Sequence, residues 1–223
     1  MTLVGWWPLH DATGAAVDYS PSNAHGTVYG ATPGATGPGP FTAYSLDGSN
    51  DYIDMGVRGS LNATFPMTVA GWVYVDSAGG DQRLFSRWPG GSPGFLLQVE
   101  DTTDEWRFLV ADNSGNRYVD AATGLTQTGQ WQHVAGVAEP NGSLRLYLDG
   151  ELAGTNDSTA TISGRTGEAL VIGCYRDNDN RKNLGADVCD LRFYDHDLSA
   201  SAVRTLIEWG TDRDLRADMV IAR

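Results

Sequence analysis

Short runs of alternating hydrophobic and polar residues dominate the chain, and Gly, Asn, Asp and Pro separate them. The runs are rich in Val, Leu, Phe, Tyr and Trp, which favour half-buried β-strands. Eight strands are predicted, over residues 68–75, 83–88, 94–100, 106–112, 131–139, 143–150, 169–174 and 188–195. Two hairpins are also predicted, because a polar DTTD turn (101–104) and a Pro-Asn-Gly corner (140–142) each join consecutive strands.

One helix interrupts this strand pattern late in the chain. Ser199 is a good N-cap for SASAVRTLIEW (199–209), and Gly210 should end the helix. The stretch PGATGPGP (33–40) is predicted to be a loop. We therefore predict an all-β fold, a two-sheet antiparallel jelly-roll sandwich with one short C-terminal helix. It should form a single domain over residues 1–210, and the tail 211–223 should be an extra edge strand or an arm that docks on a neighbour.

Charge and composition limit the classes of partner that the chain is expected to bind. With 15 basic and 28 acidic residues the net charge is −13 and the pI is near 4.5, which disfavours nucleic acid and anionic membranes. Lys182 is the only lysine, and Asp outnumbers Glu by 22 to 6. A surface rich in Asp and poor in Lys indicates adaptation to molar salt. The alternative is a GC-rich genome, which also favours Arg over Lys. The opening MTLVGWWPLHD has no basic region or apolar run of a signal peptide, and no transmembrane run is present, so export by the usual route is not expected.

Two cysteines do not make a disulfide framework. Cys174 and Cys189 flank a polar stretch, so a cross-strand disulfide and two separate thiols are both open. Neither has a histidine near it in sequence, which argues against a zinc site.

Four stretches, in order, resemble the laminin-G-like domains of the concanavalin A-like lectin/glucanase superfamily. They are GWWPLHDATGAAVDYSPSNAHGTVYGA (5–31), YSLDGSNDYIDMG (44–56), WQHVAGVAEPNGSLRLYLDGELAGT (131–155) and VIGCYRDNDNRKNLGADVCDLRFYDHDLSASAV (171–203). The resemblance spans roughly residues 4 to 209 and implies a two-sheet jelly roll. It implies no particular activity, because this fold hosts lectins, enzymes and structural modules alike.

The resemblance also implies a candidate calcium site. In the family, the loop matching DYSPSNAHG (18–26) often holds a structural Ca²⁺ together with an acid on the closing strand. Here Asp18, Asn23 and the carbonyls around Gly26 would supply oxygens, with Asp190 as the matching acid. Many relatives have two adjacent acids where this chain has Cys189 and Asp190. The alternative is an Asx-turn formed by Asp18 and Asn23 without a metal.

The residues give little support for catalysis. Paired carboxylates for glycoside hydrolysis would have to come from Glu100, Asp101, Asp104 and Glu105, which lie in a predicted solvated turn. His133 lies inside a predicted strand, where a packed histidine is expected rather than a catalytic base. No Gly-x-Ser-x-Gly nucleophile motif is present. We predict that the chain is not an enzyme.

Aromatic residues supply the candidate ligand-binding site. Most tryptophans lie in strand patterns and are expected in the core, namely Trp6, Trp7, Trp72, Trp106 and Trp131. Trp88, in the turn RWPGGSPG, and Trp209, at the helix end, are better candidates for exposure. Beside Arg87 and Tyr175, Trp88 would form a sugar-stacking platform, with core packing as the alternative.

Together these observations favour a non-catalytic module. The first hypothesis is a virion surface protein (capsid decoration, tail or spike) of a virus infecting a halophile, with other virion proteins or copies of itself as partners through residues 211–223 and host glycans as ligands. The alternative is a secreted or cell-surface carbohydrate-binding lectin module with structural calcium. A glucanase is the least supported, because paired carboxylates on a strand are missing.

Overall fold

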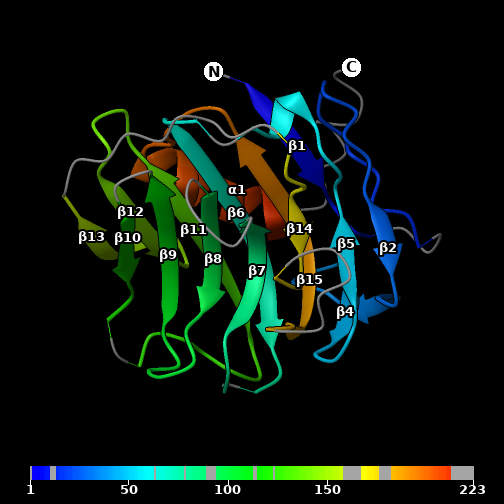
Figure 1. Cartoon of the computed structure of the whole chain (residues 1–223). Coiled ribbons are helices and arrows are strands. Elements are labelled where there is room, and N and C mark those ends of the chain that lie inside the picture. The colour runs from blue at the N-terminus through cyan, green and yellow to red at the C-terminus, as the bar shows by residue number, and fades with distance from the viewer. Residues whose placement is uncertain are drawn as a thin grey trace.

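Two stacked antiparallel sheets make up the fold, which confirms the predicted jelly-roll sandwich. The computed structural model describes residues 2–10, 14–62, 64–77, 79–88, 94–112, 115–122, 124–157, 167–175 and 182–211. Figure 1 looks onto the seven-stranded sheet, with the eight-stranded sheet behind it.

The eight-stranded sheet has the order β13-β12-β11-β6-β15-β4-β3, and β1 pairs with β15 off this path. Its strands are β1 (Leu3–Trp7), β3 (Thr32–Thr36), β4 (Thr42–Asp47), β6 (Met67–Val75), β11 (Trp131–Ala138), β12 (Leu144–Leu148), β13 (Glu151–Asn156) and β15 (Gly185–Tyr194). The predicted 131–139 and 143–150 hairpin is confirmed as β11 and β12.

The seven-stranded sheet has the order β10-β9-β8-β7-β14-β5-β2. Its strands are β2 (Thr27–Tyr29), β5 (Tyr52–Asp54), β7 (Gln82–Arg87), β8 (Gly94–Val99), β9 (Trp106–Asp112), β10 (Gly115–Asp120) and β14 (Val171–Ile172), and a 3-10 helix covers Gly59–Leu61. The second predicted hairpin is confirmed as β8 and β9. All eight predicted strands are therefore present.

The predicted loop over 33–40 is wrong in its first half, because β3 covers Thr32–Thr36. This strand pairs only with β4 and forms the edge of its sheet. An edge strand tolerates Pro33, since one side of its backbone needs no ladder partner. The register also shifts between Pro33 and Ala35, so the Gly/Pro content bends the strand without preventing it.

The core lies between the sheets, where alternate residues of each strand point inward. Trp7, Trp106 and Phe108 are among the largest side chains with no exposure. The ring of Phe108 on β9 fills the space above Gly136 on β11, and a Cβ at position 136 would lie 2.5 Å from the ring. Such close interdigitation fixes how one sheet sits on the other.

Helix α1 (Ala200–Thr211) packs on the outer face of the eight-stranded sheet, behind it in Figure 1. Val203 and Leu206 contact the sheet residues Ala70 and Tyr147. Ser199 Oγ accepts a hydrogen bond from the Ala202 amide, which confirms the predicted N-cap. The helix ends at Thr211, one residue beyond the expected Gly210, and residues 212–223 of the proposed arm lie outside the described residues. No described helix has the length and apolarity needed to cross a membrane.

Cys174 and Cys189 are both buried and are not joined by a disulfide. Cys189 packs with Trp72 on the outer side of the eight-stranded sheet, whereas Cys174 packs with Tyr52 on the outer side of the seven-stranded sheet. The core of the sandwich separates the two sulfur atoms. Of the two alternatives, a disulfide or two separate thiols, the structure shows two separate thiols.

Candidate ligand-binding site

A polar row crosses the outer face of the seven-stranded sheet. On β9 the side chain of Trp106 belongs to the core, so that of the next residue, Arg107, points outward. Arg107 is paired in register with Gln98 on β8, and Gln98 with Arg83 on β7. Three strands thus place two guanidinium groups and an amide side by side on one face.

An apolar row lies next to the polar one. Leu96 on β8 and Leu109 on β9 are paired in register on the same outer face. The half-buried ring of Trp88 packs against this pair and Ala111. Trp88 directly follows the end of β7, and its contacts hold the ring beside the polar row.

A cavity of about 470 Å³ opens between these rows. This volume lies in the usual range for small-molecule sites. Trp88 and Tyr175 supply its aromatic walls. The described lining residues are Asp81, Arg83, Trp88, Leu96, Gln98, Glu100, Asp101, Arg107, Leu109, Asn116, Tyr175 and Lys182.

Arg83 lies at the bottom of this cavity with 4% of its surface exposed. Its guanidinium carbon lies 4.4 Å from the centroid of the Tyr175 ring, and its Nη2 lies 3.6 Å from Asp81 Oδ2. Its Nε and Nη1 have no hydrogen-bond partner among the described residues. Burial lowers the pKa of Arg83, and the Asp81 carboxylate offsets this only in part.

Gln98 complements Arg83 with an acceptor. Its amide nitrogen donates to Asp81 Oδ1 at 3.1 Å. Its buried Oε1 has no hydrogen-bond partner among the residues that the structure describes. Buried polar atoms without partners are unfavourable unless water or a ligand satisfies them, so the cavity floor is prepared for a polar occupant.

Arg87 does not lie with Trp88. Its guanidinium donates to the carbonyls of Glu168 and Leu61 and to Asn62 Oδ1, at 3.2, 3.1 and 2.6 Å. Consecutive residues of an extended chain point to opposite sides, so Arg87 faces the rim of the sandwich when Trp88 faces outward. Of the three predicted site residues, the structure brings Trp88 and Tyr175 together, and Arg83 occupies the place expected for Arg87.

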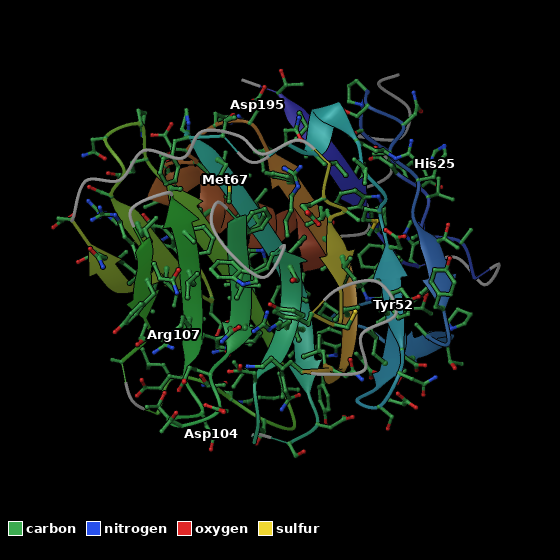
Figure 2. All side chains as sticks on the ribbon, viewed as in Figure 1. His25, Tyr52, Met67, Asp104, Arg107 and Asp195 are labelled. Atoms are coloured by element: carbon green, nitrogen blue, oxygen red, sulfur yellow. The ribbon has the colours of Figure 1, made fainter. Side chains whose placement is uncertain are left out.

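Arg107 closes the far side of the cavity. Its Nε and Nη2 donate to the two carboxylate oxygens of Asp120 at 2.6 and 2.9 Å, and its guanidinium carbon lies 4.4 Å from the Tyr118 ring centroid. In Figure 2 it lies on β9, on the side of the strand near the turn that holds Asp104. The hydrogen bond to Asp120 and then the charges of Asp120 and Glu100 raise the pKa of Arg107 despite its burial. Arg107 therefore forms a rigid cationic wall.

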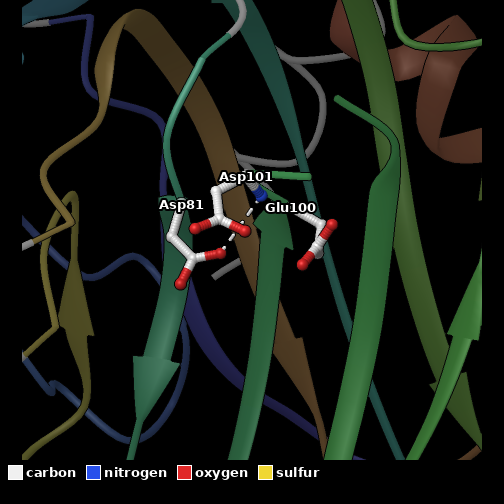
Figure 3. Close-up of side chains that lie close together, drawn as sticks. All are labelled: Asp81, Glu100 and Asp101. Carbon is white, nitrogen blue, oxygen red and sulfur yellow. Dashed lines mark hydrogen bonds between the residues drawn. The ribbon is translucent and has the colours of Figure 1, made fainter. Parts of the chain in front are cut away.

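Three acids gather at the end of the cavity. Asp81, Glu100 and Asp101 each offer a carboxylate oxygen, and these oxygens lie within 4.8 Å of one another (Figure 3). Asp101 also donates its backbone amide to Asp81 Oδ1 at 3.3 Å. Lys182 contacts Asp81, and the Glu100 carboxylate accepts the amide hydrogens of Thr102 and Thr103, which stabilises the turn. Asp101 Oδ1 accepts the Thr102 hydroxyl at 2.9 Å, so internal partners already engage all three carboxylates.

A second cavity, of about 530 Å³, adjoins the first and shares Asp81, Asp101 and Lys182 with it. The rest of its described lining is polar residues and glycines, without an aromatic ring. A sugar ring would find no stacking surface there among the described residues. The cavity with Trp88 and Tyr175 is the better ligand site.

The candidate calcium loop uses its carboxylate within the protein. Asp18 Oδ1 accepts the amide hydrogens of Trp6 and Ser20 at 2.8 and 2.7 Å. Asp18 Oδ2 accepts the Ser20 hydroxyl and the Ala24 amide at 2.8 and 2.6 Å. A carboxylate has about four acceptor sites, and all four are filled in this Asx-turn arrangement. Asn23, which is exposed, donates to the Pro21 carbonyl at 3.4 Å.

Asp190 also has protein donors. Its Oδ1 accepts the indole N–H of Trp6 at 2.7 Å and Arg192 Nε at 3.1 Å, and its Oδ2 accepts Arg192 Nη2 at 3.0 Å. Asp190 and Arg192 are each 1% exposed. A cation beside Asp190 would be held next to this guanidinium. The donor set around Asp18 and Asp190 therefore does not fit a calcium ion, and calcium binding there has only the resemblance behind it.

Residues 47–204 match the sequence model of the concanavalin A-like lectin/glucanases superfamily, in its laminin-G form. The chain belongs to this superfamily. The match runs from the end of β4 into the first turn of α1 and includes every described residue that lines the cavity. The sequence matches no curated protein at a significant level.

Solved structures resemble this superfamily member in fold. Domain 4 of AbnA, a GH43 extracellular arabinanase from Geobacillus stearothermophilus solved with arabinotriose, has a TM-score of 0.72 at 16% identity over 92% of this chain and 98% of that one. The binding domain of Paraclostridial Mosquitocidal Protein 1 has a TM-score of 0.72 at 15% identity, over 92% of this chain and 51% of that one. A Trypanosoma rangeli sialidase has a TM-score of 0.68 at 19% identity, and this chain spans 33% of it. At such identities the likeness shows the fold alone.

The superfamily includes glucanases, which use carboxyl groups as catalytic acids, and three carboxyl groups lie near the cavity. A general acid needs a pKa raised toward the working pH. Despite the opposing effect of burial, hydrogen bonds and positive charge lower the pKa of Asp81 (Lys182) and of Glu100 (Thr102, Arg107). Both carboxylates are therefore held ionised, which suits charge pairing rather than proton transfer.

Proposed function

We propose that this chain is a non-catalytic glycan-binding module, with its binding site in the cavity beside Trp88 and Tyr175. The superfamily and the fold make a carbohydrate ligand the first expectation. The observation that carries the proposal is the pairing of these two aromatic walls with the polar floor of Arg83 and Gln98.

The chemistry of a sugar suits this arrangement. A pyranose or furanose ring presents C–H groups on one side, which pack on an aromatic face, and hydroxyl groups around its rim. A hydroxyl can accept from the guanidinium of Arg83 and donate to Gln98 Oε1. Arg107 and Asn116 extend the polar lining toward β10. The ligand would then satisfy the buried atoms that lack partners among the described residues.

The carboxylates support binding rather than hydrolysis. Asp81 and Glu100 have lowered pKa values, and neither could donate a proton to a leaving group near neutral pH. Hydrolysis of a bound glycan that is lost in Asp101→Asn would contradict this part of the proposal.

The test is a glycan screen followed by calorimetry. The full chain is screened against neutral and acidic glycans at low and molar salt, and the affinity for the best ligand is then measured for the native chain and for Trp88→Ala. We expect the variant to bind about tenfold more weakly or worse, which corresponds to about 1.4 kcal/mol. Tyr29→Ala is the matched control, because Tyr29 is an exposed aromatic residue on β2 that does not line the cavity. Failure of every glycan to bind, or equal binding by Trp88→Ala, would overturn the proposal.

The setting of this module is a second and separate proposal. A place on the virion of a virus infecting a halophile has only the sequence behind it: the net charge of −13 and the single lysine favour molar salt, and the tail could dock on a neighbouring protein. The predicted partner contact is the tail 211–223. We expect the full chain to form a defined oligomer by light scattering in molar salt and the chain without the tail to be monomeric. A monomer in both forms would favour the alternative, a secreted or cell-surface lectin module.

A further inference from the structure

Trp6 lies between the two carboxylates that the family resemblance marks for calcium. Its backbone amide donates to Asp18 and its indole N–H donates to Asp190. The Arg192 guanidinium completes the group, with its carbon 5.3 Å from the centroid of the Trp6 ring. These four residues, Trp6, Asp18, Asp190 and Arg192, are called the Trp6 cluster below, and none is more than 3% exposed.

The backbone directs Asp190 into this cluster. The pairing of β15 with β6 shifts register between Cys189 and Arg192, and Asp190 has a φ of 53°. A bulge of this kind re-aims one side chain of a strand. The Asp190 amide donates to the Pro8 carbonyl at 3.0 Å, which holds the bulge against the segment that follows β1. The bulge thus brings the carboxylate to Trp6 and Arg192 together.

Charge in the cluster is balanced locally at Asp190. Asp190 and Arg192 form a two-bond ion pair with both side chains 1% exposed. A buried carboxylate is costly unless a cation or several donors accompany it. Asp190 has the guanidinium, and Asp18 has four N–H and O–H donors. Each carboxylate therefore already has what a calcium ion would supply.

We infer that protein groups take the place of a calcium ion: Trp6 and the donors of the loop hold Asp18, Trp6 and Arg192 hold Asp190, and the opening loop (18–26) needs no metal. The Arg192 guanidinium is covalently part of the chain and cannot be removed by a chelator. Its pair with Asp190 is buried, so salt screens it much less than a surface pair. The loop should accordingly keep its structure across a wide range of calcium and salt concentrations.

The test is thermal unfolding of the full chain in a chelator and in millimolar calcium. We expect the two midpoints to agree within about 1 °C, whereas a ligand present at a hundred times its dissociation constant would raise the midpoint by several degrees. If calcium raises the midpoint, its binding site is located with the variants Asp18→Asn and Asp190→Asn, each measured with and without the ion. A rise that is lost in either variant overturns the inference.

A rise that persists in both variants supports the inference, because the ion then binds elsewhere, for example at Asp81, Glu100 and Asp101. If one variant does not fold, the remaining variant decides by the same criterion. If neither folds, the native chain is titrated with calcium. The indole N–H resonance of Trp6 and the backbone amide resonances of residues 18–26 are then followed by NMR. Unchanged loop resonances support the inference, and saturable shifts of the loop resonances overturn it.

Discussion

The guanidinium carbon of Arg83 lies 4.4 Å from the centre of the Tyr175 ring, at the bottom of the cavity that Trp88 borders. Four residues later, at the end of the same strand β7, Arg87 donates three hydrogen bonds at the rim of the sandwich. One strand thus holds two buried arginines with different surroundings, one facing a cavity and one tying the 3-10 helix segment and residue Glu168 together.

Replacing these arginines with methionine should separate binding from stability. Arg83→Met should weaken glycan binding about fivefold or more and cost little stability, because part of its buried charge lacks a partner among the described residues. Arg87→Met should leave the affinity unchanged and cost about 2–4 kcal/mol, because it removes hydrogen bonds from a charged donor to buried acceptors. Calorimetric titration and urea unfolding of both variants measure the two effects. The reverse pattern, with Arg87→Met losing affinity and Arg83→Met losing stability, would contradict the assignment.

Gly136 should be intolerant of a side chain. A Cβ there would lie 2.5 Å from Phe108, on the opposite sheet, and both residues are in the packed interior. Gly136→Ala should destabilise the fold by about 1–3 kcal/mol, the usual cost of overpacking. Gly59→Ala is the control, because a Cβ at position 59 meets no atom within 4 Å, and its effect should stay within about 0.5 kcal/mol. Equal midpoints of urea unfolding for the two variants would show that the sheets separate easily at this point.

The strands that the sequence predicts differ from those that it misses mainly in their position in the sheets. Strands such as β6, β8 and β9 carry long hydrophobic runs or clear alternation, because the core covers one of their faces and other residues cover much of the second. Seven strands of the structure lie outside the eight predicted ranges, and four of them, β2, β3, β10 and β13, form the edges of the two sheets. The other three are β1, β4 and β5. Edge strands bury little surface, so Gly, Pro and Thr suffice there and resemble a loop.

The sequence pattern predicts the residues of the candidate site less well than it predicts the strands. Strict alternation from Phe85, a core residue, would place Arg83 in the core as well. The register of β7 with β8 shifts between Arg83 and Phe85, so Leu84 and Phe85 both point inward and Arg83 points outward. No residue pattern marks that bulge. The alternation alone does separate Arg87 from Trp88, and applying it at the end of β7 would have removed Arg87 from the predicted platform.

The two cysteines should behave as protected thiols. Each is 1% exposed or less, and the sandwich core separates them. A reductant should leave the unfolding midpoint unchanged. A thiol reagent should react only slowly with the native chain, whereas in denaturant it should modify two thiols per chain. Mass spectrometry after alkylation in denaturant without reductant gives the count. A chain that accepts no alkyl group until it is reduced would contradict the assigned thiols.

His133 should make the fold sensitive to acid. The side chain is 1% exposed, and burial, assisted by the nearby Arg192 charge and opposed by Asp190, lowers its pKa to about 4. The unfolded chain binds a proton at this residue near pH 6.5, so the unfolded state gains protons before the folded state does. The free energy of unfolding should therefore fall as the pH drops from about 6.5 to about 4, by about 3 kcal/mol for this group, and the loss should level off below pH 4.

The matched variant is His133→Gln, which cannot titrate and keeps a polar side chain next to Trp72. Urea unfolding of both proteins at pH 7 and pH 4 isolates the contribution of His133, because the carboxylates contribute alike to both. We expect the native chain to lose about 3 kcal/mol more than the variant between these two pH values. Equal losses would mean that His133 takes up its proton in the folded state near its ordinary pKa, and that the space between Trp72 and Arg192 admits water or charge that its burial excludes.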